Sequence, residues 1–271
     1  MMQPLAVAVA GLGSIGLRVA RALDDGLPGF RLAAVASSSI DRAQAAVSGF
    51  RVPPRVRTLE DLPQEADIVI ECLPPSVFPV LAEHVAAHAP SYLLVVSAGA
   101  LISVSEATER LEARGVKIIV PSGAVAGLDA LRAARAAGLQ SVRLVTRKQP
   151  GSFGGSVIHD GVEVATTSIT QPLLLFEGSA REAVTHYPKN INVAATISLA
   201  GLGADATAVE IWADPNVAGN CHELHLRSLA GESRSTAINL PDPNNPSSSA
   251  ITGFSVIAAL RRLNDPVSIG S

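Results

Sequence analysis

A glycine-rich turn stands directly between a buried strand and a helix at residues 5–23, and this arrangement constrains the fold more than any other part of the chain. The apolar run from Leu5 to Ala10 has the length and composition of a strand buried on both faces. Gly11, Gly13 and Gly16 follow at once, ahead of apolar residues at helical spacing. Such a turn between strand and helix is typical of a dinucleotide-binding unit, whereas an isolated glycine-rich turn is often purely structural.

Each glycine has a separate role in a unit of this kind. Gly11 permits the tight turn, Gly13 lets the backbone approach a pyrophosphate, and Gly16 allows the helix and the strand to pack closely. The N–H groups at the start of the helix then point at the phosphates. We therefore predict a dinucleotide-binding loop that consists of Gly11, Gly13, Ser14, Ile15 and Gly16.

Strand and helix patterns alternate through the first half of the chain. The further strands predicted there are residues 31–36, 67–72, 92–96 and 116–120, and the further helices are residues 41–47, 77–89 and 103–114. This alternation is typical of an α/β fold with a doubly wound parallel (Rossmann) sheet.

From about residue 140, strand-like segments alternate polar and apolar residues, which is typical of an antiparallel sheet with one wetter face. The strands expected there are residues 141–147, 161–170, 208–213, 221–228 and 233–240. Helices are expected over residues 179–183, 190–199 and 251–263, and the segment 241–249 is expected to be a loop. We therefore predict a dinucleotide-binding domain (1–121), an α+β substrate domain with a mostly antiparallel sheet (122–245), and a C-terminal helix (246–271) that packs back on the first domain.

Composition and charge exclude several classes of partner. The 271 residues are 48% hydrophobic and only 17% charged, with a net charge of −3, so no basic surface is expected for nucleic acid or anionic lipid. No apolar run reaches the roughly 18 residues of a membrane span. Two cysteines are too few for a disulfide scaffold, and the first strand begins too early for a signal peptide. We expect a cytoplasmic protein that binds neither nucleic acid nor membrane, and the apolar second domain leads us to expect a homodimer.

The tip of the second predicted strand bears on the choice of dinucleotide. A site selective for NAD has an acidic residue about 20 residues past the glycines, where it holds the ribose 2′-hydroxyl. Here the strand runs into Ser37, Ser38 and Ser39, with Arg42 nearby. Hydroxyl groups and a guanidinium fit a 2′-phosphate, although serines also cap helices. We predict that Ser37, Ser38 and Arg42 contact the cofactor, which is NAD or NADP, and that NADP is accepted.

His222 is the candidate catalytic residue, because it stands at the start of a predicted strand where a rigid element aims it. A histidine takes or gives a proton near neutral pH, although a structural histidine bonded to its neighbours is the alternative. His225 and Cys221 face the other side of that strand, which excludes a zinc pair and a Cys–His nucleophile. His84 and His88 are one helical turn apart, but no third ligand accompanies them, so no metal site is predicted.

Residues 187–196 form the second candidate site. Lys189 and Asn190 open a predicted helix, whose N-terminal N–H groups favour an anion or a carboxamide. Asn190 acting only as a helix cap is the alternative. We name Lys189 and Asn192 as candidate substrate-binding residues. Positive side chains in this half that are able to hold a dicarboxylate also include Arg147 and Lys148, and the sequence does not rank them.

Several segments together resemble the L-aspartate dehydrogenase family over nearly the whole chain. They are Gly-Leu-Gly-Ser-Ile-Gly (11–16), Pro-Ser-Gly-Ala-Val-Ala-Gly (121–127), Pro-Lys-Asn-Ile-Asn-Val-Ala-Ala-Thr (188–196), Ala-Asp-Pro-Asn (213–216) with Asn-Cys-His-Glu (220–223), and the C-terminal segment 249–260. Many unrelated enzymes share the glycine loop, whereas the middle segments are far more specific.

The resemblance implies NAD(P)-dependent oxidative deamination of L-aspartate to iminoaspartate, and then to oxaloacetate and ammonia, reversibly and in connection with NAD biosynthesis. It also implies that His222 is the catalytic histidine and that Ala124 and Asn190 contact the cofactor.

Two other interpretations stay open at this point. One is a related NAD(P)-dependent oxidoreductase of the homoserine dehydrogenase or dihydrodipicolinate reductase type, since fold alone does not discriminate between them. The paired-histidine signature of the reductase is absent from this sequence. The other is a non-enzymatic NAD(P)-binding sensor, but the chain has no spare segment or basic patch for the DNA-binding module that such sensors usually carry.

Overall fold

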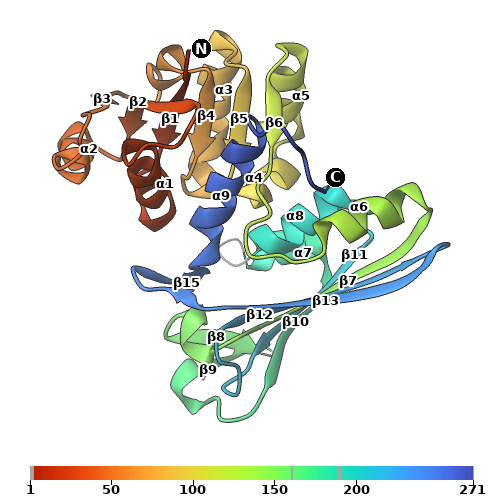
Figure 1. Ribbon diagram of the computed structural model, residues 1–271. Coiled ribbons are helices and arrows are strands. Elements are labelled where there is room, and N and C mark those ends of the chain that lie inside the picture. Colours follow the sequence, from red (N-terminus) through yellow and green to blue (C-terminus); the bar gives the residue numbers. More distant parts are fainter. Residues whose placement is uncertain (1–2, 160, 188–190, 271) are drawn as a thin grey trace. The chain divides into compact units, whose positions relative to one another are not determined.

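The first half of the chain forms a six-stranded parallel sheet in the order β3-β2-β1-β4-β5-β6, which confirms the predicted doubly wound topology (Figure 1). The computed structural model describes residues 3–159, 161–187 and 191–270. The chain divides into two units, Met1–Gly123 with Gly253–Ser268, and Ala124–Thr252 with Ile269–Ser271. Each unit has its own sheet and its own core.

The strands and helices of the first unit follow the predicted alternation. The strands are β1 (Leu5–Ala10), β2 (Phe30–Ala36), β3 (Arg55–Val56), β4 (Ile68–Glu71), β5 (Tyr92–Val95) and β6 (Lys117–Ile119). The helices are α1 (Ser14–Asp24), α2 (Ile40–Val47), α3 (Phe78–His88), α4 (Ala98–Ser103), α5 (Ser105–Ala113) and, from the end of the chain, α9 (Ile251–Arg262).

The first unit contains one helix that was not predicted. The helix expected over residues 103–114 is present as α5 (Ser105–Ala113), and α4 (Ala98–Ser103) directly precedes it. Val104 lies between them with a non-helical backbone (φ −132°, ψ 65°). The segment that follows β5 is therefore helical from Ala98, five residues before the predicted start of the helix.

Strand β1 is buried on both faces, as its apolar run predicts. Val7 and Val9 pack in one cluster with α1, α2 and α9, whereas Ala8 and Ala10 pack in a second cluster with α3, α4 and α5. Helix α9 contributes Val256 to the first of these clusters. The sheet is thus the middle layer of three, which is the arrangement that alternating strands and helices produce.

The second unit is built on a five-stranded sheet in the order β10-β11-β7-β12-β13. Its strands are β7 (Leu139–Lys148), β8 (Ser156–His159), β9 (Val162–Ala165), β10 (Leu173–Ser179), β11 (Thr207–Ala213), β12 (Asn220–Ser228), β13 (Gly231–Asn239), β14 (Pro241–Asp242) and β15 (Asn245–Ser249). Its helices are α6 (Leu128–Ala136), α7 (Ala180–His186) and α8 (Asn192–Ala200). Strands β11 and β7 pair in parallel and the other neighbours pair antiparallel, so the predicted mostly antiparallel sheet is confirmed.

Two segments of the second unit differ from their predictions. The strand expected over residues 161–170 is only Val162–Ala165, because a 3₁₀ turn at Thr166–Ser168 ends it. This strand pairs with β8 in a separate hairpin. The expected loop 241–249 contains the paired strands β14 and β15. There the carboxylate of Asp242 accepts a hydrogen bond from the Asn244 N–H at 2.9 Å, which stabilises the reversal of the chain.

The two faces of this sheet have different surroundings. Helices α6, α7 and α8 cover one face, where the second unit has its main core (Figure 1). The β8–β9 hairpin packs in a smaller cluster with Ala213 and Leu173. The face opposite the main core carries charged side chains. There the Arg147 guanidinium lies 4.6 Å from the centre of the Trp212 ring and 3.5 Å from the Asp214 carboxylate.

Candidate functional site

The glycine loop joins the carboxyl end of β1 to the start of α1, at the edge of the sheet where such folds bind ligands. Gly11 has a left-handed backbone (φ +94°), and its N–H donates to the Ala36 carbonyl oxygen at 2.9 Å. A Cβ on Gly16 would lie 1.9 Å from the Gly11 carbonyl oxygen. Both glycines are therefore required by the fold itself, because no larger residue fits without displacing the backbone.

Gly13 differs from its two neighbours, and this difference tests whether the loop fits a dinucleotide. Its φ of −72° is ordinary, and a Cβ placed there would meet nothing within 4 Å. It is the N-cap of α1, and no side chain caps that helix. Open space beside uncapped N–H groups fits a pyrophosphate. Ser14 and Ile15, the first two residues of α1, are half-buried beside this space.

The structure brings Ser38 and Arg42 together at the tip of β2. The Arg42 guanidinium donates to Ser38 Oγ at 3.2 Å, and both side chains are exposed. Ser39 accepts from the Arg42 N–H at 3.3 Å and so caps α2. Ser37 is half-buried at the end of the strand. Ser39 alone therefore caps the helix. The exposed Ser38 and Arg42 side chains carry donors from which a phosphate is able to accept hydrogen bonds.

Glu71 is a buried polar residue at this edge that the sequence analysis missed. One oxygen of its carboxylate accepts from the Leu73 N–H at 2.6 Å, and the other accepts from the N–H groups of Val96 and Ser97 and from Ser97 Oγ. Burial raises the pKa of Glu71, against the lowering effect of these hydrogen bonds. The carboxyl group therefore ties together the segments that follow β4 and β5. An acidic residue at the end of an apolar strand was the available signal.

In the second unit, two neighbouring strands change from apolar to polar at the same end. On the helix-covered face, β7 carries Val142, Leu144, Thr146 and Lys148 in chain order. The antiparallel strand β12 carries, beside them in the same direction, Leu226, Leu224, His222 and Asn220. The register pairs Leu144 with Leu224, and Thr146 with His222. The four polar residues are all buried, with exposures of 4% for Thr146, 5% for Lys148, 1% for Asn220 and 5% for His222.

Buried polar residues gathered in this way are typical of a functional site, since each of them destabilises the fold unless it is satisfied. We call Thr146, Lys148, Asn220 and His222 the polar end of the sheet. The sequence analysis named His222 and Lys148 but missed Thr146 and Asn220, because the pairing of β7 with β12 is not visible in either strand alone.

His222 is held as a neutral imidazole. Its Nδ1 lies 3.1 Å from Thr146 Oγ1. Burial, and then the positive charge of Lys148, lower the pKa of His222 to about 3. A neutral imidazole is able to accept a proton from a bound ligand, and the contact with Thr146 fixes the orientation of its ring.

The other predicted residues of the second unit lie in different places. Ala124 is buried, and its carbonyl oxygen accepts from Asn239 Nδ2 at 2.9 Å. Asn239 is paired with Asn220, so this bond connects Ala124 to the polar end of the sheet. Asn192 is the first residue of α8, and its carbonyl oxygen accepts from Thr196 Oγ1. Lys189 and Asn190 lie outside the described residues.

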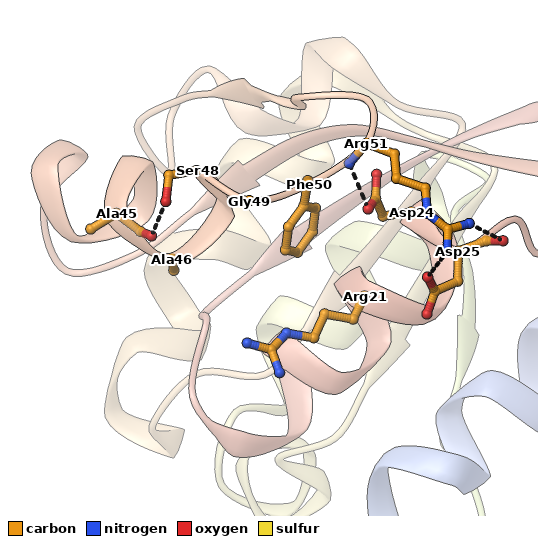
Figure 2. Close-up of a pocket in the computed structure, with 9 residues that line it drawn as sticks. All are labelled: Arg21, Asp24, Asp25, Ala45, Ala46, Ser48, Gly49, Phe50 and Arg51. Carbon is orange, nitrogen blue, oxygen red and sulfur yellow. Dashed lines mark hydrogen bonds and ion pairs between the residues drawn. The ribbon is translucent and has the colours of Figure 1, made fainter.

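A surface hollow lies elsewhere, where α1 and α2 end (Figure 2). It is lined by Arg21, Asp24, Asp25, Ala45, Ala46, Ser48, Gly49, Phe50 and Arg51. The Arg51 and Val52 N–H groups donate to the Asp24 carboxylate, so the loop after α2 is fixed to the end of α1. Because α1 starts at the glycine loop and ends here, the hollow is at the opposite end of this helix from the predicted phosphate site.

Within the described residues, no group of three or more His, Cys, Asp or Glu side chains is arranged to hold a metal ion. No helix in that part of the chain is both long enough and apolar enough to cross a membrane.

Comparisons with known proteins agree with both units. Residues 11–121 match the family model described as homoserine dehydrogenase, NAD binding domain, and residues 129–263 match aspartate dehydrogenase, C-terminal. An L-aspartate dehydrogenase of Bradyrhizobium diazoefficiens is 40% identical over 98% of this chain and 94% of its own length. One of Methanosarcina barkeri is 37% identical over 98% of this chain and 100% of its own.

Solved structures show the same fold. The crystal structure of aspartate dehydrogenase from Thermotoga maritima has a TM-score of 0.73 with 24% identity, covering 98% of this chain and 99% of that one. A homoserine dehydrogenase from Thiobacillus denitrificans has a TM-score of 0.62 with 15% identity, covering 96% of this chain and 73% of that one.

A Rossmann sheet with a glycine loop, followed by a second unit with a mixed sheet and a buried histidine, defines a nicotinamide-dependent dehydrogenase, and both family models agree with this class. Within that class the relatives are specific. The chain belongs to the L-aspartate dehydrogenase family, as the sequence motifs predicted.

Gly13 and Gly16 provide a matched pair of substitutions for the dinucleotide site. Gly13→Ala should unfold like the wild type, because its Cβ meets only open space. It should bind NADH at least about tenfold more weakly, because we expect the pyrophosphate to occupy that space. Gly16→Ala should lose about 3 kcal/mol of stability because its Cβ collides with the backbone. Urea unfolding and a fluorescence titration with NADH measure both effects. Unchanged NADH affinity in Gly13→Ala would show that the phosphates bind elsewhere.

His222 should make stability depend on pH in the acid range. Its pKa of about 3 in the folded chain lies below its ordinary value of 6.5, so between these values the unfolded chain binds a proton that the folded chain does not. Stability is therefore lost as the pH falls from 6.5 toward 3. Between pH 7 and pH 5 the wild type should lose about 2 kcal/mol more than His222→Gln does, measured by urea unfolding. Equal losses in both proteins would mean that His222 is not buried as a neutral group.

Proposed function

We propose that this protein oxidises L-aspartate with NAD or NADP, and that His222 is the residue that moves the proton. The observation that carries the proposal is the position of His222, neutral, buried and oriented by Thr146, at the polar end of the sheet in a chain of the L-aspartate dehydrogenase family. The overall reaction converts L-aspartate and NAD(P)⁺ to iminoaspartate, NAD(P)H and a proton. Water then converts iminoaspartate to oxaloacetate and ammonia.

In this proposal the first unit holds the cofactor. The loop with Gly11, Gly13 and Gly16 would hold the pyrophosphate at the start of α1, where the N–H groups have no side-chain cap. Glu71 keeps the segments after β4 and β5 in place at the same edge of the sheet. When bound, the oxidised nicotinamide supplies the acceptor for the hydride that leaves the α-carbon of the substrate.

His222 accepts the proton of the substrate's ammonium group, either directly or through one water molecule. Loss of that proton places a lone pair on nitrogen, and this lone pair forms the carbon–nitrogen double bond as the hydride leaves. The carboxylates of the substrate favour the imidazolium form, and so they counteract the burial and the Lys148 charge that keep His222 neutral beforehand. Thr146 keeps the ring in one orientation throughout. The same imidazolium is then able to return its proton to the amine as ammonia leaves.

A second candidate substrate is homoserine, because the first unit matches the NAD-binding model of homoserine dehydrogenase. The second unit, which carries the polar end of the sheet, matches the aspartate dehydrogenase model instead. The choice between the two substrates therefore depends on the second unit, and we favour aspartate.

The activity is tested by following absorbance at 340 nm with NAD or NADP and L-aspartate, L-homoserine or no amino acid. We expect NAD(P)H to form with aspartate. His222→Asn should lower kcat at least about a hundredfold, because a positioned base contributes roughly 10²–10⁴-fold, while NADH affinity stays near that of the wild type. Turnover with homoserine alone would exclude aspartate as the substrate. Unchanged kcat in His222→Asn would exclude the histidine as the base.

We also propose that NADP is accepted through Ser37, Ser38 and Arg42. The support is the exposed Arg42–Ser38 pair at the tip of β2. Arg42→Ala should raise KM for NADP about tenfold or more, because a charge-assisted hydrogen bond to the 2′-phosphate is lost, and should leave KM for NAD within about twofold. Steady-state kinetics with both cofactors measure this split. An equal effect on both cofactors, or a wild type that uses NAD only, would contradict the proposal.

Three further expectations stay predictions: a homodimer, a cytoplasmic location, and a connection of the reaction to NAD biosynthesis. Asn190, Lys189, Ala124 and Asn192 likewise stay candidates for contacts with cofactor and substrate.

A further inference from the structure

The polar end of the sheet contains a buried cation and a buried acceptor that the proton transfer does not use. Lys148 and Asn220 are one residue beyond the register pair Arg147 and Cys221, and therefore lie on the opposite face from that pair, together with His222. Asn220 Nδ2 donates to Ser249 Oγ at 3.1 Å. Asn220 Oδ1 is buried, and no described residue donates a hydrogen bond to it.

Lys148 is charged at neutral pH even though it is removed from water. Burial lowers its pKa to about 8, which still leaves the ammonium group mostly protonated near pH 7. A desolvated ammonium attracts an anion more strongly than an exposed lysine does, because little water screens the charge. Lys148 is thus a fixed positive charge inside the site.

Arg147, the neighbouring cation, is excluded from the same role by its position. It faces the other side of the sheet, where its guanidinium stacks on Trp212 and lies 3.5 Å from Asp214 and 3.7 Å from Glu223. Two carboxylates and an aromatic ring already satisfy that charge. Of these two adjacent residues, only Lys148 shares a face with His222.

We propose that Lys148 binds a carboxylate of an amino-dicarboxylic substrate and that Asn220 Oδ1 accepts a hydrogen bond from its ammonium group, beside His222. This inference rests on the proposed function and deepens it, because it names the residues that select the substrate. A zwitterion with an additional negative charge requires a cation and an acceptor, and the polar end of the sheet supplies both. Asn220, the hydrogen-bond acceptor for the ammonium group, is on the same strand as His222, the proton acceptor, and two residues before it.

The experiment measures ligand binding by calorimetry to the protein loaded with NADH, a form in which aspartate is not oxidised. The probes are succinate, which has two carboxylates and no amine, butyrate, which has one carboxylate, and L-aspartate. The variants are Lys148→Met and Asn220→Ala. Arg143→Met is the matched control, because it removes a cation from the same strand on the opposite face, where Arg143 pairs with Glu210.

Lys148→Met should weaken succinate binding at least about 30-fold and leave NADH affinity unchanged, while Arg143→Met binds succinate like the wild type. Asn220→Ala should weaken L-aspartate about fivefold or more and leave succinate unchanged, because succinate has no ammonium group. If Lys148→Met does not fold, as judged by its melting temperature and NADH binding, Lys148→Gln is measured in the same way.

Two results would overturn the inference. One is a folded Lys148 variant that binds succinate as tightly as the wild type does, and the other is a wild type that prefers succinate no more than butyrate. Failure of the proposed function is a separate observation, since it is the absence of aspartate-dependent NAD(P)H formation by the wild type. A wild type that oxidises aspartate while its Lys148 variant still binds succinate would leave the function intact and remove only Lys148 from it.

Discussion

The antiparallel pairing of β7 with β12 is the interaction on which the second unit depends. It aligns Thr146 with His222 and Leu144 with Leu224, so that one row of side chains is apolar under the helices and becomes polar at one end. Because side chains alternate along a strand with a period of two, this register decides which residues enter the core and which face the other way. The hydrogen bond between Thr146 and His222, and the approach of Lys148, both follow from it.

The burial of Lys148 and His222 serves the proposed function at a cost in stability. Burial lowers the pKa of both Lys148 and His222, which means that the fold disfavours the charged form of each. An apolar residue at either position would remove that penalty. The remainder of the face, from Val142 and Leu144 to Leu226, supplies the hydrophobic burial that offsets it. A loss of stability at buried polar residues is common at functional sites.

The sequence predicted the first unit well because its signals are local. The glycine loop, the flanking strand and the helix are contiguous, and parallel strands buried on both faces appear as uninterrupted apolar runs. The second unit was harder, because β7 and β12 are about 75 residues apart along the chain and neither strand contains the register that joins them. His222 was identifiable from its motif. Thr146 and Asn220 were not, because a threonine in a strand and an asparagine before a cysteine carry no separate signal. Helix α6 was also missed, because Leu131 is its one fully buried residue and a single buried position gives no helical periodicity.

Arg147 and Lys148 show how strictly the backbone divides chemistry between adjacent residues. From the sequence both are cations of similar reach, and nothing in it ranks them. In the sheet they point to opposite faces, so Arg147 contacts Asp214, Glu223 and the Trp212 ring, while Lys148 shares a buried face with His222. A slip of one residue in the β7 register would exchange them, and it would also bury Val145 and Arg143 where Leu144 and Val142 now pack. The hydrophobic core therefore excludes that slip, and the apolar half of each strand fixes the chemistry of its polar half.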